Sequence, residues 1–178
     1  MPTIYQSKKM TAQDDATRYA IAASLDFLQA RSVTQTAVAE HLGVRPSAIT
    51  QLRGGVHGMA AKHGWPFFRL IVDTAKAHPL TLGEVKHLHD VIQAWHSALA
   101  QKAQVLVAQL NILSKERTDL QTKKNPSKAD LRRLNQLASQ YTNASKSLRQ
   151  YTGLMEAWQA AAGDLAAVIE EARRKVTL

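Results

Sequence analysis

Apolar residues recur at three- and four-residue steps along two long stretches in the second half of the chain. The first stretch runs from Leu82 to Leu113, and the second runs from Leu131 to Ala172. Such steps are typical of one face of an α-helix. The pattern therefore predicts two long helices, each around 40 residues and so about 60 Å in length.

The segment between these stretches predicts a turn. Pro126 opposes a continuing helix because it lacks an amide hydrogen and its ring clashes with the preceding turn. Ser127, with Asp130 three residues later, resembles a capping box in which Asp replaces Glu. Residues 81–178 are therefore expected to form a long antiparallel helical hairpin, similar to a coiled coil.

A hairpin of two helices cannot bury both of its apolar faces completely. Alanines spaced along both stretches permit close helix contacts, and another copy of the chain would most easily cover the remaining apolar surface. We therefore expect a homo-oligomer formed through residues 81–178. The alternative is a monomeric hairpin that folds against the N-terminal helices.

The first half of the chain has shorter apolar repeats. Residues 1–13 are expected to form a flexible arm, and residues 14–78 to form a bundle of four or five short helices. Asp14 and Asp15 place acidic side chains at the positive end of the first helix. Tyr19 is one of its expected core positions. Together with the hairpin, this bundle makes the predicted fold class all-α.

The chain after residue 54 contains a predicted break, a further helix and three tryptophans. Glycines after Arg53 break the chain, and another helix is expected to start near Pro66 and to end before Pro79. The tryptophans at 65, 95 and 158 lie at helical spacing, which favours core or interface positions over base-stacking platforms.

Residues 35–54, QTAVAEHLGVRPSAITQLRG, carry the offsets of a helix-turn-helix. Ala39, at the fifth position, must be small because the second helix crosses close to its backbone. Gly43, at the ninth, suits a tight turn in which a positive φ is cheap only without a Cβ. Ile49, at the fifteenth, is expected to hold the second helix inward. The remaining inward positions are Val38, Leu42, Val44 and Leu52.

The same register leaves a polar row on the outer face of the second helix, where a recognition helix meets the major groove. Arg45 is a poor N-cap, so a phosphate or a guanine contact explains it better than helix capping does. Pro46 suits the first helical turn, where its missing amide hydrogen costs nothing. The outward row consists of Arg45, Ser47, Thr50, Gln51 and Arg53.

The motif resembles the helix-turn-helix domains of the lambda-repressor/Cro group. The resemblance covers residues 35–54 and extends to the helices of residues 14–78. It implies that Gln35 bonds a phosphate and that the early residues of the second helix read bases, which are Pro46, Ser47, Thr50 and Gln51 here. Pro46 departs from the pattern because it offers no donor where polar residues are common.

Composition agrees with a polyanionic partner. The formal charge is +9 and the isoelectric point lies near 10.0, a balance that favours nucleic acid through counterion release. Lys123, Lys124 and Lys128 form a basic hairpin tip, either solvated or in contact with phosphates or an acidic partner. The chain has no cysteine, which excludes disulfides and thiolate metal sites and fits a reducing cytoplasm.

Other chemistry finds little support in the residues. No apolar run is long enough to span a membrane, and the first residues do not resemble a signal peptide. His87, His89 and His96 lack the spacing of a shared metal site. No phosphate loop or catalytic constellation is recognisable. We therefore expect no metal, no cofactor and no enzymatic activity.

The favoured function is binding of duplex DNA by a transcriptional regulator, a repressor that acts as a homo-oligomer on a symmetric operator. Ser47, Thr50 and Gln51 would read base edges, while Gln35, Arg45 and Arg53 would hold phosphates. Small terminase subunits of tailed phages are similar in plan, and recognition of viral DNA for packaging is the alternative. A plasmid-maintenance protein is a third option, and oligomer size separates the first two.

Overall fold

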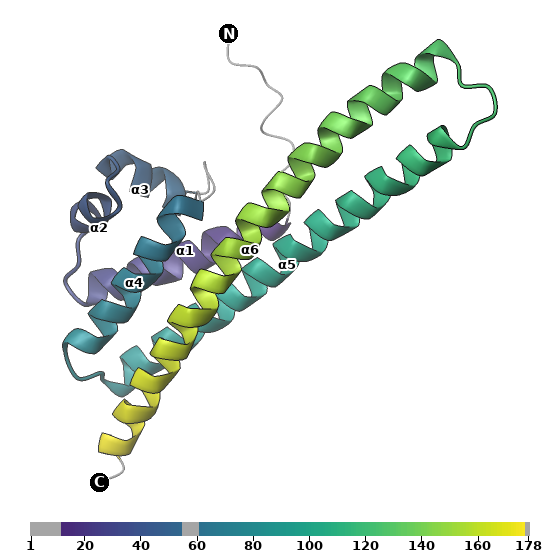
Figure 1. Cartoon of the computed structure of the whole chain (residues 1–178). Helices are drawn as coiled ribbons and strands as arrows, with labels where there is room; N and C mark the ends of the chain where they lie inside the picture. Colours follow the sequence, from purple (N-terminus) through teal and green to yellow (C-terminus); the bar gives the residue numbers. More distant parts are fainter. Residues whose placement is uncertain (1–11, 55–60, 177–178) are drawn as a thin grey trace. The chain divides into compact units, whose positions relative to one another are not determined.

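The computed structural model describes residues 12–54 and 61–176, and the helices there confirm the predicted all-α class (Figure 1). The expected arm of residues 1–13 lies outside this description as far as residue 11, and residues 12 and 13 already belong to the first helix. The helices are α1 (Ala12–Ala30), α2 (Gln35–Leu42), α3 (Pro46–Arg53), α4 (Ala61–Ala77), α5 (Leu82–Gln121) and α6 (Lys128–Val176).

The chain divides into two compact units. Unit 1 comprises residues 1–99 together with residues 154–178, and unit 2 comprises residues 100–153. Unit 1 therefore contains α1 to α4, the first part of α5 and the last part of α6. The predicted division into a helix-turn-helix domain of residues 14–78 and a hairpin oligomerisation domain of residues 81–178 stays a prediction.

An aromatic cluster forms the centre of unit 1. The ring of Phe68 from α4 lies 4.9 Å from that of Trp95 on α5 and 4.9 Å from that of Trp158 on α6, measured between ring centroids. All three side chains are almost completely buried. Edge-on packing of this kind adds to the large apolar area that such rings remove from water. The cluster thus joins three helices that are far apart in sequence.

A buried hydrogen bond connects α1 to the same cluster. Trp95 Nε1 donates to Ser24 Oγ at 2.9 Å, and Ser24 Oγ donates to the carbonyl oxygen of Ala20 at 2.7 Å. Ser24 is fully buried, so these bonds remove the penalty that an unpaired hydroxyl would carry there. Trp65 differs from the other two tryptophans because it is 48% exposed, with the Arg69 guanidinium 5.7 Å from its ring centroid.

Arg31 connects the end of α1 to the connection between α4 and α5. Its guanidinium donates to the carbonyl oxygen of His78 at 2.7 Å and to the carboxylate of Glu84 at 2.9 Å. Glu84 also accepts from the amide of Thr81 at 2.8 Å, and its own amide donates to the Thr81 hydroxyl at 3.2 Å. This is a capping box at the start of α5. Burial alone would raise the pKa of Glu84, but the bonds from Thr81 and Arg31 hold it below its usual value.

Two expectations for the short helices were wrong. Tyr19 is 62% exposed on α1 and is not part of the core, because Ala20 and Ile21 occupy the buried face at that level. Helix α4 begins at Ala61 and contains Pro66. The proline is tolerated near the start of the helix because the carbonyl that loses its amide partner belongs to Lys62, which is exposed to solvent.

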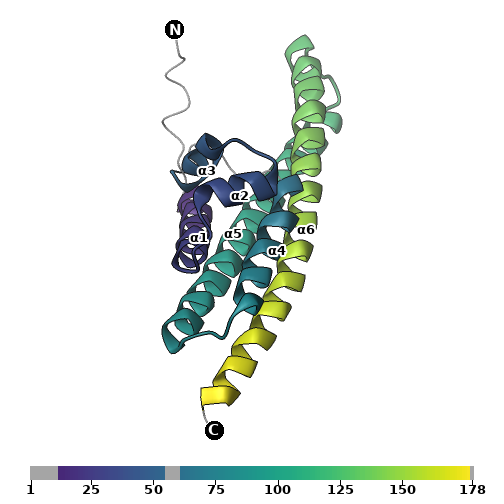
Figure 2. The same ribbon diagram turned by 90° about the vertical axis from the view of Figure 1, so that its left-hand side faces the viewer.

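Helix α4 also lies beside the last part of α6 (Figures 1 and 2). Arg69 on α4 donates to the carboxylate of Asp164 on α6 at 2.7 Å, and Lys76 lies 3.8 Å from the same carboxylate. These half-exposed pairs contribute little to stability by themselves, but they agree with the packing of Phe68, which is next to Arg69 on α4, against Trp158 on α6. Within unit 1, α4 is therefore covered by both long helices.

Unit 2 consists of the second part of α5, the turn, and the first part of α6. Its core is small: Leu113, Leu137 and Ala144 are buried, with Leu110 and Leu120 packed beside them. The side chains of Glu116 and Arg133 pair at 2.7 and 2.9 Å across the two helices. Lys123, which is further along the chain than Glu116, pairs with Asp130, which precedes Arg133. This reversed order confirms that the two helices run antiparallel in this unit, as the sequence predicts.

The turn confirms the predicted capping box at the start of α6. The Asp130 amide donates to the Ser127 hydroxyl at 3.1 Å, and the Ser127 amide donates to the Asp130 carboxylate at 2.9 Å. Lys123 donates to the same carboxylate at 3.0 Å. The bond from the Ser127 amide and the bond from Lys123 lower the pKa of Asp130 to about 2. Asp130 is thus ionised and engaged at neutral pH.

Candidate nucleic-acid interface

The turn between α2 and α3 is closed by glycine, as the motif predicts. Gly43 has φ +64°, in the left-handed region that favours glycine. Its amide donates to the Glu40 carbonyl at 3.1 Å, and the amide of Val44 donates to the Ala39 carbonyl at 2.9 Å. These two bonds form a Schellman motif, which satisfies the last carbonyls of α2 and redirects the chain into α3. Thr34 caps the other end of α2, its hydroxyl accepting from the Ala37 amide at 3.2 Å.

Apolar side chains then fix the orientation of α3. Ala39 is completely buried, Val38 and Ile49 are 1% exposed, and Leu42 is 7% exposed, which confirms their predicted inward positions. Val44 and Leu52 are only partly buried. Helix α2 packs against α3 and α4, while α3 packs against α1. The second helix of the motif is therefore held on two sides, with its remaining face in solvent.

The predicted DNA-binding residues occupy that solvent face. Arg45, Pro46, Ser47, Thr50 and Gln51 are all exposed. Ser47, Thr50 and Gln51 share one face of α3 because they are three and four residues apart. Arg45 precedes the helix in an extended conformation and forms no side-chain cap, and Pro46 is the first residue of α3. Gln35 lies apart from this row, half-buried at the start of α2.

Arg53 differs from the other predicted contacts because it already has a partner. Its Nη2 lies 2.5 Å from Oδ1 of Asp26 on α1, and both side chains are substantially exposed. A guanidinium has five donors, so this pair leaves donors for a phosphate. The pair also places a carboxylate beside the proposed DNA surface, where it opposes an approaching phosphate. Sequence reasoning missed this contact because Asp26 and Arg53 belong to different helices.

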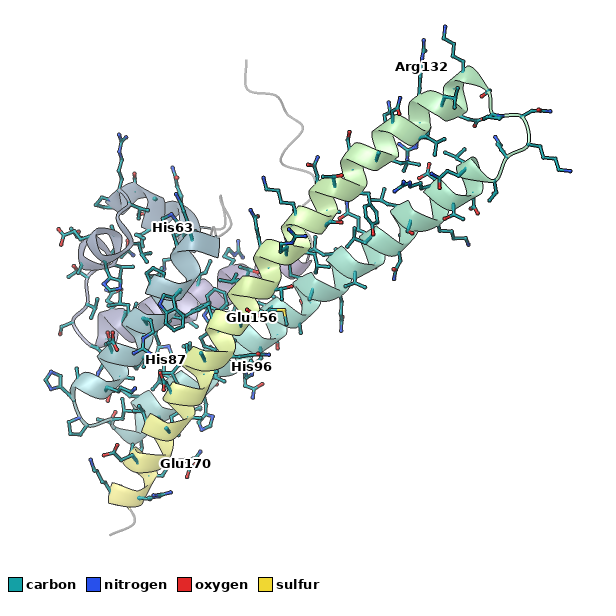
Figure 3. The ribbon with its side chains drawn as sticks, viewed as in Figure 1. His63, His87, His96, Arg132, Glu156 and Glu170 are labelled. Carbon is teal, nitrogen blue, oxygen red and sulfur yellow. The ribbon has the colours of Figure 1, made fainter. Side chains whose placement is uncertain are left out.

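His87 and His96, labelled in Figure 3, pack against aromatic side chains of unit 1. The ring of His87 packs edge-on against Phe27, with centroids 6.0 Å apart, and His96 packs similarly against Trp158. His89 and His96 line an open groove of about 460 Å³ between α5 and α6, together with Ile92, Ile169 and Glu170. Among the described residues, no group of three potential ligands could hold a metal ion.

Comparison of the chain with protein-family models, with curated proteins and with solved structures finds no match. None of the helices that the structure describes is long and apolar enough to cross a membrane.

The left-handed turn residue provides a test of the motif geometry. Gly43→Ala should lower the free energy of unfolding by about 1–2 kcal/mol, because alanine is strained at positive φ although the space around its Cβ is open. Gly153→Ala is the matched control. Gly153 lies inside α6 with open space around it, so alanine there should raise stability by about 0.5–1 kcal/mol. Urea denaturation measures both, and an unchanged or higher stability for Gly43→Ala would contradict the turn.

Proposed function

We propose that the protein binds duplex DNA through α3 and acts as a transcriptional regulator, a repressor that occupies a symmetric operator as a homo-oligomer. The observation that supports this proposal most directly is the turn at Gly43, which holds α3 against α1 by one face. The opposite face carries hydrogen-bond donors and acceptors that are exposed to solvent. A recognition helix needs this combination of a supported inner face and a polar outer face.

Each exposed residue suits a particular contact. The amide of Gln51 can bond two atoms of an adenine edge, and the hydroxyls of Ser47 and Thr50 can donate or accept at either kind of base pair. Arg45 has no partner among the described residues, so its guanidinium is available for a phosphate or a guanine. Gln35 and Arg53 would contact phosphates on either side of the recognition helix.

Self-association is part of the proposal because unit 2 buries few apolar side chains. Its buried apolar residues are Leu106, Leu113, Leu137 and Ala144, yet several large apolar side chains are exposed. A second copy would cover them and would place two recognition helices on the two halves of a palindromic site. The exposed residues are Val105, Val107, Ile112, Leu131 and Tyr141.

Gln51→Ala should weaken binding to a cognate site by about 1–3 kcal/mol and relax the base preference at one position. The site is first selected from a random DNA pool with the parent protein, and affinity is then measured by fluorescence anisotropy. Gln29→Ala, an exposed glutamine on α1, is the matched control and should bind as the parent does. Equal binding by the Gln51 variant and the parent would mean that α3 does not read the bases.

Asp26→Asn should strengthen DNA binding by about 1 kcal/mol or less, because it releases Arg53 and removes a negative charge beside the phosphates. A double-mutant cycle with Arg53→Ala separates these two effects. If Arg53 contacts a phosphate, part of the gain from Asp26→Asn disappears in the Arg53→Ala background. A gain of the same size in both backgrounds would exclude Arg53 from the interface.

The native mass in solution tests the proposed homo-oligomer. A dimer or tetramer by light scattering or native mass spectrometry agrees with a regulator on a symmetric operator. Leu131→Gln with Ile112→Gln should shift the mass towards the monomer, since both side chains are more than half exposed and only a partner can bury them. A closed ring of many subunits would instead indicate DNA packaging, and a monomeric parent would exclude self-association.

A further inference from the structure

The positive charge of this protein is concentrated in unit 2. Residues 100–153 contain ten Lys and Arg against three Asp and Glu, a net charge of +7 out of +9 for the whole chain. The rest of the chain, which includes the helix-turn-helix, has thirteen basic and eleven acidic residues and is nearly neutral. Attraction to a polyanion therefore comes mainly from unit 2 rather than from α3.

Two of the three acidic residues of unit 2 are paired with particular basic residues. Glu116 is held by Arg133 in a two-point ion pair, and Asp130 is occupied by Lys123 and the capping box. Along α6, no acidic residue occurs between Asp130 and Glu156. Exposed lysines and arginines on this stretch therefore have no carboxylate beside them on their own helix.

The basic residues on this part of α6 share one face. At 3.6 residues per turn, Lys128, Arg132, Lys146 and Arg149 lie within an arc of about 100°. All four side chains are exposed, whereas the buried residues Leu137 and Ala144 lie on the opposite face. We call these four residues the basic stripe. Apart from the apolar Leu131, the exposed residues between them on the same face are polar and uncharged, and include Asn135, Ser139, Thr142 and Asn143.

This placement is unfavourable for the helix itself. Lys128 is the first residue of α6, where the helix dipole is positive and disfavours cations, and Arg132 adds a second positive charge one turn further along. The last turn of α6 has the favourable arrangement, with Arg173, Arg174 and Lys175 at the negative end. Self-repulsion together with the dipole means that the stripe lowers stability unless an anionic partner offsets it.

We propose that the basic stripe is a second DNA-binding surface, which holds the phosphate backbone of a duplex without reading its sequence. From Lys128 to Arg149 the helix rises about 32 Å, close to one turn of duplex DNA. Lysine and arginine contact phosphates, and the hydroxyl and amide side chains between them add neutral donors to the same backbone.

Duplex DNA fits the stripe better than single strands do. Surfaces that bind single strands use aromatic side chains on which bases stack, and the stripe carries none. Duplex DNA also presents the denser line of phosphates, with one charge per about 1.7 Å of helix axis. Figure 3 shows Arg132 pointing away from the ribbons into solvent, where a backbone can reach it. This surface does not depend on base reading by α3.

The test compares the full-length parent with a variant in which Lys128, Arg132, Lys146 and Arg149 are all changed to Gln. Glutamine preserves helix propensity, and circular dichroism verifies the fold. Affinity for a short labelled duplex of arbitrary sequence is measured by fluorescence anisotropy between about 50 and 200 mM NaCl. The slope of log K against log salt should fall by about 3–4, since each lost phosphate contact lowers it by about 0.9.

A matched control removes the same charge from unit 1. Arg18, Lys62, Lys86 and Arg174 are exposed there, and changing all four to Gln leaves the same net charge as the stripe variant. This control should change the salt slope by less than about 1. Two half-variants, Lys128→Gln with Arg132→Gln and Lys146→Gln with Arg149→Gln, should each lower the slope by about 2. They keep the test decisive if the fourfold variant fails to fold.

The outcomes separate this proposal from the function proposed for α3. Gln51→Ala should lose base preference and keep the parent's slope of log K against log salt. The stripe variant should keep the base preference and show a smaller slope. An unchanged slope in the stripe variants would overturn the proposal, as would an equal fall in the unit 1 control. Loss of binding to phosphatidylserine vesicles without a change on DNA would also overturn it and would assign the stripe to a membrane surface.

Discussion

The packing of Phe68 between Trp95 and Trp158 is the interaction on which unit 1 depends. It brings together α4, α5 and α6, and the hydrogen bond from Trp95 to Ser24 adds α1. Helix α3 has no direct part in this cluster. It is positioned through α1 and α2, which the cluster and the α4 packing hold in place. The orientation of the proposed reading helix therefore depends on two tryptophans that lie far from it in sequence.

Charge and base-reading chemistry are divided between the two units. Unit 1 presents the polar face of α3, and its net charge is close to zero. Asp26 neutralises Arg53 beside that face. Unit 2 has a small core and most of the net charge. In duplex recognition, base contacts supply specificity and phosphate contacts supply a large share of the affinity. The distribution of residues in this chain matches such a separation of tasks, with α3 proposed for the first and the basic stripe for the second.

Periodicity predicted the long helices, and residue types at fixed offsets predicted the turn of the motif, because both signals are local. The Ser127–Asp130 capping box, the left-handed Gly43 and the buried Ala39 and Ile49 follow from residue types at fixed offsets. Prediction was weaker where two faces of one helix compete for burial. Tyr19 belongs to the apolar pattern of α1 but faces solvent, and Pro66 marked a helix start by its usual preference although α4 begins earlier.

By itself, the sequence determined the all-α class, the turn of the helix-turn-helix and the polar outer row of α3, because hydrogen bonding and φ preferences act over a few residues. Only the tertiary structure decided which tryptophans are buried, that Arg53 pairs with Asp26 and that Arg31 joins three helix ends. It also decided that four basic residues of unit 2 share a helix face opposite the buried Leu137 and Ala144. These features depend on which helices meet, and contacts between residues dozens of positions apart leave no periodic signal in one chain.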